Sequence, residues 1–182
     1  MLRLEDKVCL VTGAGRGIGA KTARLMAQAG AHVVVSDVCE RSAINVCNQI
    51  KDEDGSALGL NLDVSSPDAW RAVVAKINSS FKKLDVLVNN AAMLLGKDIE
   101  DVSIEEWTQT VAVNMTSVFL GTKMCASALR TSGAVSKSGS LIVNISSVSG
   151  LVAAPLDPLY SMTKGGVTLF TKSTAVTFAK KR

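Results

Sequence analysis

Short apolar runs alternate along the chain with longer amphipathic segments. The apolar runs, rich in β-branched residues, cover positions 8–12, 33–36, 57–62, 86–88 and 141–145. Runs of this kind are typical of strands that are buried on both faces, as in a parallel sheet. Helices are predicted over positions 17–29, 40–52, 67–82, 104–130 and 159–180. The segment 131–139, TSGAVSKSG, is expected to be a loop before the fifth strand.

The regular alternation of strand and helix predicts an α/β fold. Right-handed crossovers between parallel strands give an open, doubly wound sheet with helices on both faces, in three α/β/α layers. The length of 182 residues favours one domain, which we expect to span 1–182. Ligands of such sheets bind beyond the carboxyl ends of the strands, so polar residues at those ends are the candidates for function.

Composition and charge exclude several classes of protein. The net charge is +4, and the basic residues are scattered except for the last three, 180–182. Only 4% of residues are aromatic, so the basic stripe with interleaved aromatics of a nucleic-acid binder is absent. No apolar run approaches the ~20 residues of a membrane span. The first residues, MLRLEDKV, include two acids and predict no targeting segment, so we expect a cytoplasmic protein.

The cysteines and the single histidine carry weak signals. Cys9, Cys39, Cys47 and Cys125 show no metal-ligand spacing, and we interpret them as reduced thiols with no metal site. His32 precedes the run VVVSD and is interpreted as a strand-entry residue. A hydrolase triad would have to use this one histidine, and we discount a triad on that ground.

The first predicted strand runs into a glycine-rich turn, TGAGRGIG, over 12–19. Glycines let the backbone approach a pyrophosphate, whose charge is met by the N-terminus of the next helix. The alternative is an ordinary tight turn. Asp37 ends the second strand about 20 residues later, where an acid binds the ribose hydroxyls and repels a 2′-phosphate. This favours NAD over NADP, although Arg16 could pair with that extra phosphate.

The third and fourth strands also end in polar residues. Asp63 and Val64 follow the third strand, and Asp63 is expected near the adenine. Capping of the helix that begins at Pro67 accounts for the serines just before it. The fourth strand continues into Asn89–Ala92, small and polar residues against which a cofactor can lie.

The fifth strand and the last helix carry the candidate chemistry. Two serines, the second of them Ser147, follow the strand, and Tyr160 lies further along at the start of the helix. Lys164 is at i+4 from Tyr160, so the two lie on one helix face. A nearby cation stabilises phenoxide and suits a tyrosine to proton transfer. Alone, such a pair is more often an ordinary amphipathic pair, but here it follows a dinucleotide motif.

Together these motifs resemble the short-chain dehydrogenase/reductase family from about Leu4 onward. The resemblance also includes Asn114 in VAVNMTSVF and NISSVSG at 144–150. It implies a Rossmann fold and hydride transfer between nicotinamide and a secondary alcohol or ketone, hydroxysteroids among them. By the resemblance, Tyr160 is the general acid/base, Ser147 positions the substrate oxygen, Lys164 binds the nicotinamide ribose, and Asn114 holds a water in a proton relay. The residues expected to bind the cofactor are Gly13, Arg16, Gly17, Ile18, Gly19, Asp37, Asp63, Val64, Asn90, Ala91, Ala92, Tyr160 and Lys164.

The chain also departs from the family pattern. Ala92 stands where the family usually has glycine, and the stretch from Asn114 to Ser147 is long. The family continues after this last helix with further strands and a substrate-covering region, so we expect 1–182 to lack them and to leave the fifth strand as a sheet edge. This keeps a second hypothesis open, a non-catalytic dinucleotide-binding or interaction protein.

Two further expectations concern the substrate and the assembly. The substrate pocket is expected to draw on 93–96 and 148–158, where apolar residues suggest an apolar substrate or simply pack together. A homo-oligomer, dimer or tetramer, is expected from the family resemblance.

Overall fold

Five parallel strands form the central sheet. The computed structural model describes residues 4–153 and 157–179. The strands are β1 (Val8–Thr12), β2 (His32–Asp37), β3 (Ser56–Asn61), β4 (Val86–Asn89) and β5 (Leu141–Asn144). They pair in the order β3-β2-β1-β4-β5, and every neighbouring pair is parallel. This order confirms the predicted doubly wound sheet, and β5 lies at an edge of it.

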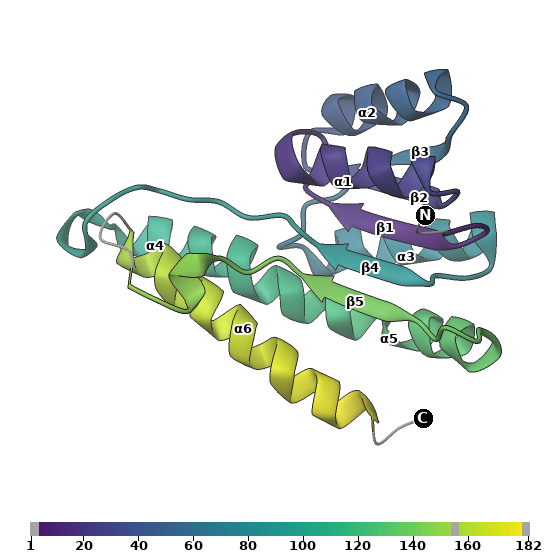
Figure 1. Cartoon of the computed structure of the whole chain (residues 1–182). Helices are drawn as coiled ribbons and strands as arrows, with labels where there is room; N and C mark the ends of the chain where they lie inside the picture. Colours follow the sequence, from purple (N-terminus) through teal and green to yellow (C-terminus); the bar gives the residue numbers. More distant parts are fainter. Residues whose placement is uncertain (1–3, 154–156, 180–182) are drawn as a thin grey trace.

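Helices cover both faces of this sheet (Figure 1). The α-helices are α1 (Gly17–Gln28), α2 (Glu40–Asp52), α3 (Pro67–Phe81), α4 (Ile104–Val111), α5 (Ser117–Val135) and α6 (Pro158–Ala179). A π-helical turn, η2 (Ala112–Thr116), joins α4 to α5, and two 3₁₀ turns are η1 (Ile99–Asp101) and η3 (Val148–Gly150). α1 and α2 lie on one face, α3 and α5 lie on the other, and α6 runs beside β5 (Figure 1). Three layers result.

Alternate residues of each central strand supply two separate cores. In β1, Val8 and Leu10 pack with Trp70 of α3 and with α5, whereas Cys9 and Val11 pack with α1 and α2. These four apolar residues of β1 are fully buried. Because strand side chains point to opposite faces in turn, an uninterrupted apolar run is what a sheet covered on both sides requires.

The predicted start of α3 is confirmed, and β2 begins one residue before the predicted run 33–36. His32 begins β2, where its ring stacks on Phe81 and its Nδ1 lies 2.8 Å from Ser56 Oγ. The Ser66 hydroxyl caps α3 by accepting from the Ala69 N–H at 3.2 Å, and Pro67 follows at the first helical position. A missing proline N–H costs nothing there, since that donor has no partner within the helix.

The predicted loop over 131–139 is wrong in its first half. Helix α5 continues to Val135, so residues 131–135 are helical. The buried Ser132 hydroxyl accepts a hydrogen bond from the Leu84 N–H at 3.1 Å, and Leu129 is buried one turn earlier. Tertiary contacts therefore override a composition that favours a loop. The predicted helix 104–130 is also interrupted, by the π-helical turn η2.

Some sequence expectations lie outside the described residues. These are the basic terminal residues 180–182, with the predicted end of the last helix, and positions 154–156 of the expected substrate pocket.

Candidate functional site

A cavity of about 530 Å³ opens at the carboxyl ends of β1 to β4. Residues from the glycine turn, the ends of β2 and β3 and the segment after β4 line it, together with three from α4 and η2. The predicted cofactor residues among them are Gly13, Arg16, Gly17, Ile18, Gly19, Asp37, Asp63, Val64, Asn90, Ala91 and Ala92. The fold thus brings together every candidate from the first four strand ends. Tyr160 and Lys164 do not line this cavity.

The glycine turn is packed so closely at Gly13 and Gly19 that a side chain would not fit at either position. A Cβ on Gly19 would lie 2.4 Å from the Gly13 carbonyl oxygen, and Gly13 itself has a φ of +59°. The Asn90 amide holds the turn by donating to the carbonyls of Thr12 (2.9 Å) and Gly13 (3.1 Å). The Thr12 hydroxyl accepts from the N–H groups of Asn90 (3.0 Å) and Ala91 (3.1 Å). Thr12 begins the predicted motif TGAGRGIG, but no role was predicted for it.

The N-terminus of α1 suits an anionic ligand. Unlike α3 and α4, which begin with serine caps, α1 has no side-chain cap and no acid in its first turn among the described residues. Gly17 has a φ of +57° and faces open space, so the backbone there is accessible from the cavity. Uncapped N–H groups at a helix start, next to glycines that admit close approach, fit the pyrophosphate of a dinucleotide.

Asp37 sits at the end of β2 and is engaged on both oxygens. Its Oδ2 accepts from the Gly15 N–H at 2.9 Å and its Oδ1 accepts from the Cys39 N–H at 3.0 Å. The carboxylate therefore braces the glycine turn as well as facing the cavity. Arg16 is exposed at the same cavity, so the two residues with opposite preferences for a 2′-phosphate lie at one site.

Asp63 and Val64 close the cavity after β3. Asp63 Oδ1 accepts from the N–H and the hydroxyl of Ser65, at 2.9 and 2.6 Å. Val64 is buried, and its carbonyl accepts from the Trp70 indole N–H at 2.9 Å. Trp70 of the core thereby fixes the position of this edge of the cavity.

Asn114 lies in the π-helical turn and is 1% exposed. Its Oδ1 accepts from the Met93 N–H at 2.8 Å, and its Nδ2 donates to the Met93 carbonyl at 2.9 Å and to Thr163 Oγ1 at 3.1 Å. The Thr163 hydroxyl in turn donates to the Tyr160 carbonyl at 2.8 Å. Asn114 thus links the segment after β4 to α6. Thr163 was another residue that the sequence analysis missed.

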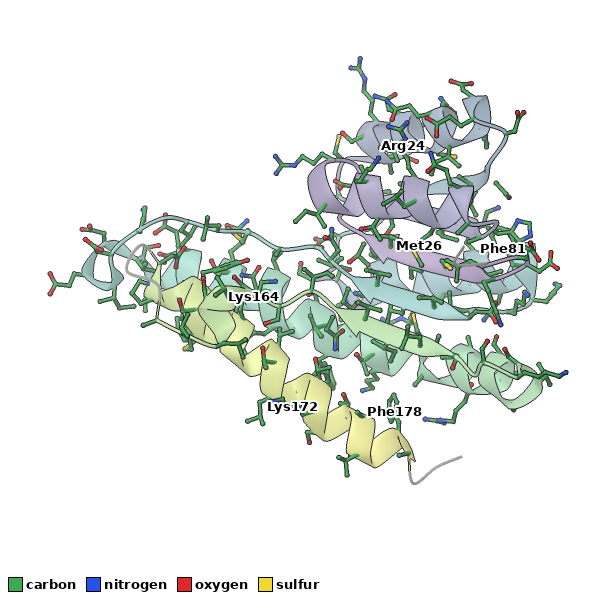
Figure 2. The ribbon with its side chains drawn as sticks, viewed as in Figure 1. Arg24, Met26, Phe81, Lys164, Lys172 and Phe178 are labelled. Carbon is green, nitrogen blue, oxygen red and sulfur yellow. The ribbon has the colours of Figure 1, made fainter. Side chains whose placement is uncertain are left out.

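Lys164 is buried between α6 and the end of β5 (Figure 2). Its ammonium donates to the Ile145 carbonyl at 2.7 Å and lies 5.5 Å from the centre of the Tyr160 ring. The Ser146 hydroxyl donates to the Lys164 carbonyl at 3.0 Å, which fixes this turn of the helix to the strand end. Burial lowers the pKa of Lys164, because the charged form is deprived of water.

Ser147 is the N-cap residue of η3, just after the end of β5. Its hydroxyl accepts from the Ser149 N–H at 3.1 Å. It lies two residues beyond Ile145, the residue whose carbonyl binds Lys164. The Tyr160–Lys164 pair and Ser147 therefore belong to one region, at the carboxyl end of β5 and beside the cavity-lining strands.

A buried acid next to this region was not predicted. Asp157, 4% exposed, directly precedes α6 and binds three backbone N–H groups. The signal available in the sequence was an acid followed by proline at a helix start.

Among the residues that the structure describes, no group of three or more His, Cys, Asp or Glu is placed to hold a metal ion. Within the same residues, none of the helices has both the length and the apolar character needed to cross a membrane.

Comparisons with known proteins agree on one family. A family model described as short chain dehydrogenase matches residues 7–182. The chain is 40% identical to a cyclopentanol dehydrogenase of Comamonas sp. (strain NCIMB 9872), over 98% of this chain and 70% of that protein. It is 36% identical to a trans-4-hydroxycyclohexanecarboxylate dehydrogenase of Sinomonas cyclohexanicum, over 96% of this chain and 67% of that protein. It is 38% identical to a 3-alpha-(or 20-beta)-hydroxysteroid dehydrogenase of Mycobacterium bovis, over 96% of this chain and 64% of that protein.

Proposed function

The chain belongs to the short chain dehydrogenase family, and on this premise we propose that it is an NAD-dependent oxidoreductase that interconverts a secondary alcohol and its ketone. The observation that carries the proposal is the buried Lys164 ammonium beside the Tyr160 ring, at the same sheet edge as the glycine-lined cavity. A bound nicotinamide dinucleotide supplies the acceptor for the hydride that leaves the carbinol carbon.

The residues of the chain handle the proton and the geometry. Tyr160 is the general base that accepts the hydroxyl proton of the alcohol. The carbonyl bond forms as that proton leaves. Ser147 is the partner for the substrate oxygen. Lys164 supports Tyr160 by its positive charge and is proposed to bind the nicotinamide ribose. Asn114 is proposed to hold a water of the proton relay, from its place between Met93 and Thr163.

The preference for NAD is attributed to Asp37. Its carboxylate faces the cavity from the end of β2, where a 2′-phosphate would meet a negative charge held in place by two N–H donors. Arg16 opposes this preference, but its side chain is exposed and its charge is therefore screened by water and salt.

A cyclic, mainly apolar alcohol is proposed as the substrate. The names of three relatives specify cyclopentanol, a hydroxycyclohexanecarboxylate and a hydroxysteroid, all of them ring alcohols. Leu94, Leu151 and Val152, in the two segments expected to line the pocket, are largely exposed and offer apolar contact area. Cyclopentanol is therefore the first substrate to test.

A homo-oligomer, dimer or tetramer, is proposed for the assembled protein. A groove of about 340 Å³ between α5 and α6 is lined by apolar residues, including Phe119 and Phe170. Phe119 is 47% exposed, and burial of such a surface against a second copy would stabilise the association.

All four cysteines lie within the described residues and are free, which fits a reducing compartment such as the cytoplasm.

The test compares the wild-type chain with Tyr160→Phe. Reduction of NAD by a panel of secondary alcohols, cyclopentanol first, is followed at 340 nm, and NAD binding is measured separately by calorimetry. We expect Tyr160→Phe to bind NAD normally and to lose at least about 100-fold in kcat, as for loss of a general base. Equal, negligible rates for both proteins with intact NAD binding would refute the enzyme function and support the non-catalytic alternative. Loss of NAD binding by the folded wild-type chain would refute the cofactor assignment.

A further inference from the structure

One buried carboxylate joins the start of α6 to the segment that follows β4. Asp157 Oδ1 accepts from the Tyr160 N–H at 2.7 Å. Its other oxygen, Oδ2, accepts from the N–H groups of Leu95 (3.0 Å) and Gly96 (2.9 Å). Asp157 is 4% exposed. A single side chain thereby fixes the relative position of two segments more than 60 residues apart in the sequence.

The local chemistry explains why an acid suits this position. Asp157 occupies the N-cap of α6, Pro158 follows as the first helical residue, and the capped donor belongs to the third, Tyr160. The positive end of the helix dipole and three N–H donors together compensate the buried negative charge. Gly96 has a φ of +69°, which gives the second segment the turn that presents its N–H to the carboxylate.

Two other attachments act on the second turn of α6. Asn114 joins Met93, in the segment after β4, to Thr163, and Lys164 and Ser146 bind the same turn to the end of β5. Asp157 joins the first turn of α6, which carries Tyr160, to Leu95 and Gly96.

We propose that Asp157 is a positioning residue that sets the place of Tyr160 relative to the substrate-side segment 93–96. This proposal rests on the proposed function, because it assigns Tyr160 the proton transfer. A general base must come within hydrogen-bond distance of the hydroxyl, and a displacement of about 1 Å can cost roughly 100-fold in rate. Asp157 acts through the backbone of Tyr160 and through the wall of the pocket, without touching the reacting atoms.

Two substitutions separate the two halves of this contact. Asp157→Ser retains an oxygen that can cap the Tyr160 N–H but has none for Leu95 and Gly96. Asp157→Asn retains one carbonyl oxygen, and its NH₂ group then faces N–H donors on the other side. Neither variant can satisfy both segments. Ser103→Ala is the matched control, since it removes the cap of α4, where Ser103 Oγ accepts from the Glu106 N–H at 3.1 Å.

The measurements are kcat and KM with cyclopentanol, NAD binding by calorimetry, and amide hydrogen exchange of a peptide covering 93–97. For Asp157→Ser and Asp157→Asn we expect kcat to fall by about tenfold or more, with NAD affinity within about twofold of wild type. Exchange at Leu95 and Gly96 should accelerate in Asp157→Ser. Ser103→Ala should keep its kcat and its exchange in this peptide, even where it lowers thermal stability.

Three outcomes would overturn the proposal. These are a wild-type kcat in Asp157→Ser with exchange accelerated, unchanged exchange in Asp157→Ser, or an equal loss of kcat in Ser103→Ala. Absence of turnover by the wild-type chain would instead refute the proposed function, and the exchange measurement would still decide whether Asp157 holds the two segments together.

Discussion

Gly19 offers a stringent test of how the cofactor cavity is built. Gly19→Ala adds one methyl group to the first turn of α1. That carbon would lie 2.4 Å from the Gly13 carbonyl oxygen, 2.5 Å from Asn90 Nδ2 and 2.9 Å from Ala14 Cα. Two of these three atoms belong to the backbone, and Asn90 is itself fixed by its bonds to Thr12 and Gly13. The neighbours therefore cannot move aside without breaking contacts.

The magnitude follows from three opposing terms. Overpacking costs about 1–3 kcal/mol. Loss of the two Asn90 hydrogen bonds adds about 1 kcal/mol each. Alanine gains at most about 1 kcal/mol over glycine in a helix. We therefore expect Gly19→Ala to lower the free energy of unfolding by roughly 2–4 kcal/mol and to weaken NAD binding, because the helix must shift away from the glycine turn.

Gly165→Ala in α6 is the matched control. A Cβ there would lie 3.7 Å from the Gly150 carbonyl oxygen, an ordinary van der Waals contact. The free energy of unfolding of this variant should therefore rise by about 0.5–1 kcal/mol, because alanine suits a helix interior better than glycine. Urea unfolding of both variants and of wild type measures the difference. A Gly19→Ala protein as stable as Gly165→Ala would refute the close packing of α1 against the glycine turn.

Three further predictions concern charge and ionisation. Asp37→Ala should reduce the preference for NAD over NADP, measured as the ratio of kcat/KM values, by about tenfold or more through loss of the like-charge repulsion; an unchanged ratio would exclude Asp37 as the selector. Burial lowers the pKa of Lys164, so between that pKa and about 10.4 the unfolded state binds more protons and stability rises with pH. The stability of Lys164→Met relative to wild type should therefore be highest at neutral pH and should fall as pH rises. A difference in the free energy of urea unfolding that does not change with pH would contradict this. A neighbouring serine hydroxyl lowers the pKa of the exposed Cys39 thiol, whereas burial raises the pKa of Cys9 and Cys125 to about 12. Iodoacetamide should therefore alkylate Cys39 first in the native protein, and mass spectrometry showing faster modification of a buried cysteine would contradict the assignment.

Much of the cofactor cavity could be predicted because its residues are grouped in short motifs. The glycine turn follows β1 directly, and Asp37, Asp63 and Asn90 each lie at or just beyond a strand end. Once the sheet is parallel, its strand ends must meet at one edge, so predicting the strands was enough to bring these residues together.

The helical segment 131–135 illustrates what sequence reasoning could not reach. Serine, threonine and glycine favour loops there, yet Ser132 satisfies the Leu84 N–H and the helix continues. The π-helical turn at Asn114 could not be predicted for the same reason. The Asn114 side chain binds Met93, which lies in a separate segment, and local propensity gives no sign of that contact.

Sequence patterns alone predict the order of strands and helices, the glycine turn, the acid at the end of β2, and the placement of Tyr160 and Lys164 on one helix face. Each of these depends on hydrophobic periodicity or on residues within a few positions of one another. The folded structure was needed to show that Thr12 holds the Asn90 backbone, that Lys164 is buried against Ile145, and that Asp157 joins α6 to the segment after β4. These contacts join residues far apart in the sequence, where a buried donor or acceptor must find a partner and no local pattern indicates which one.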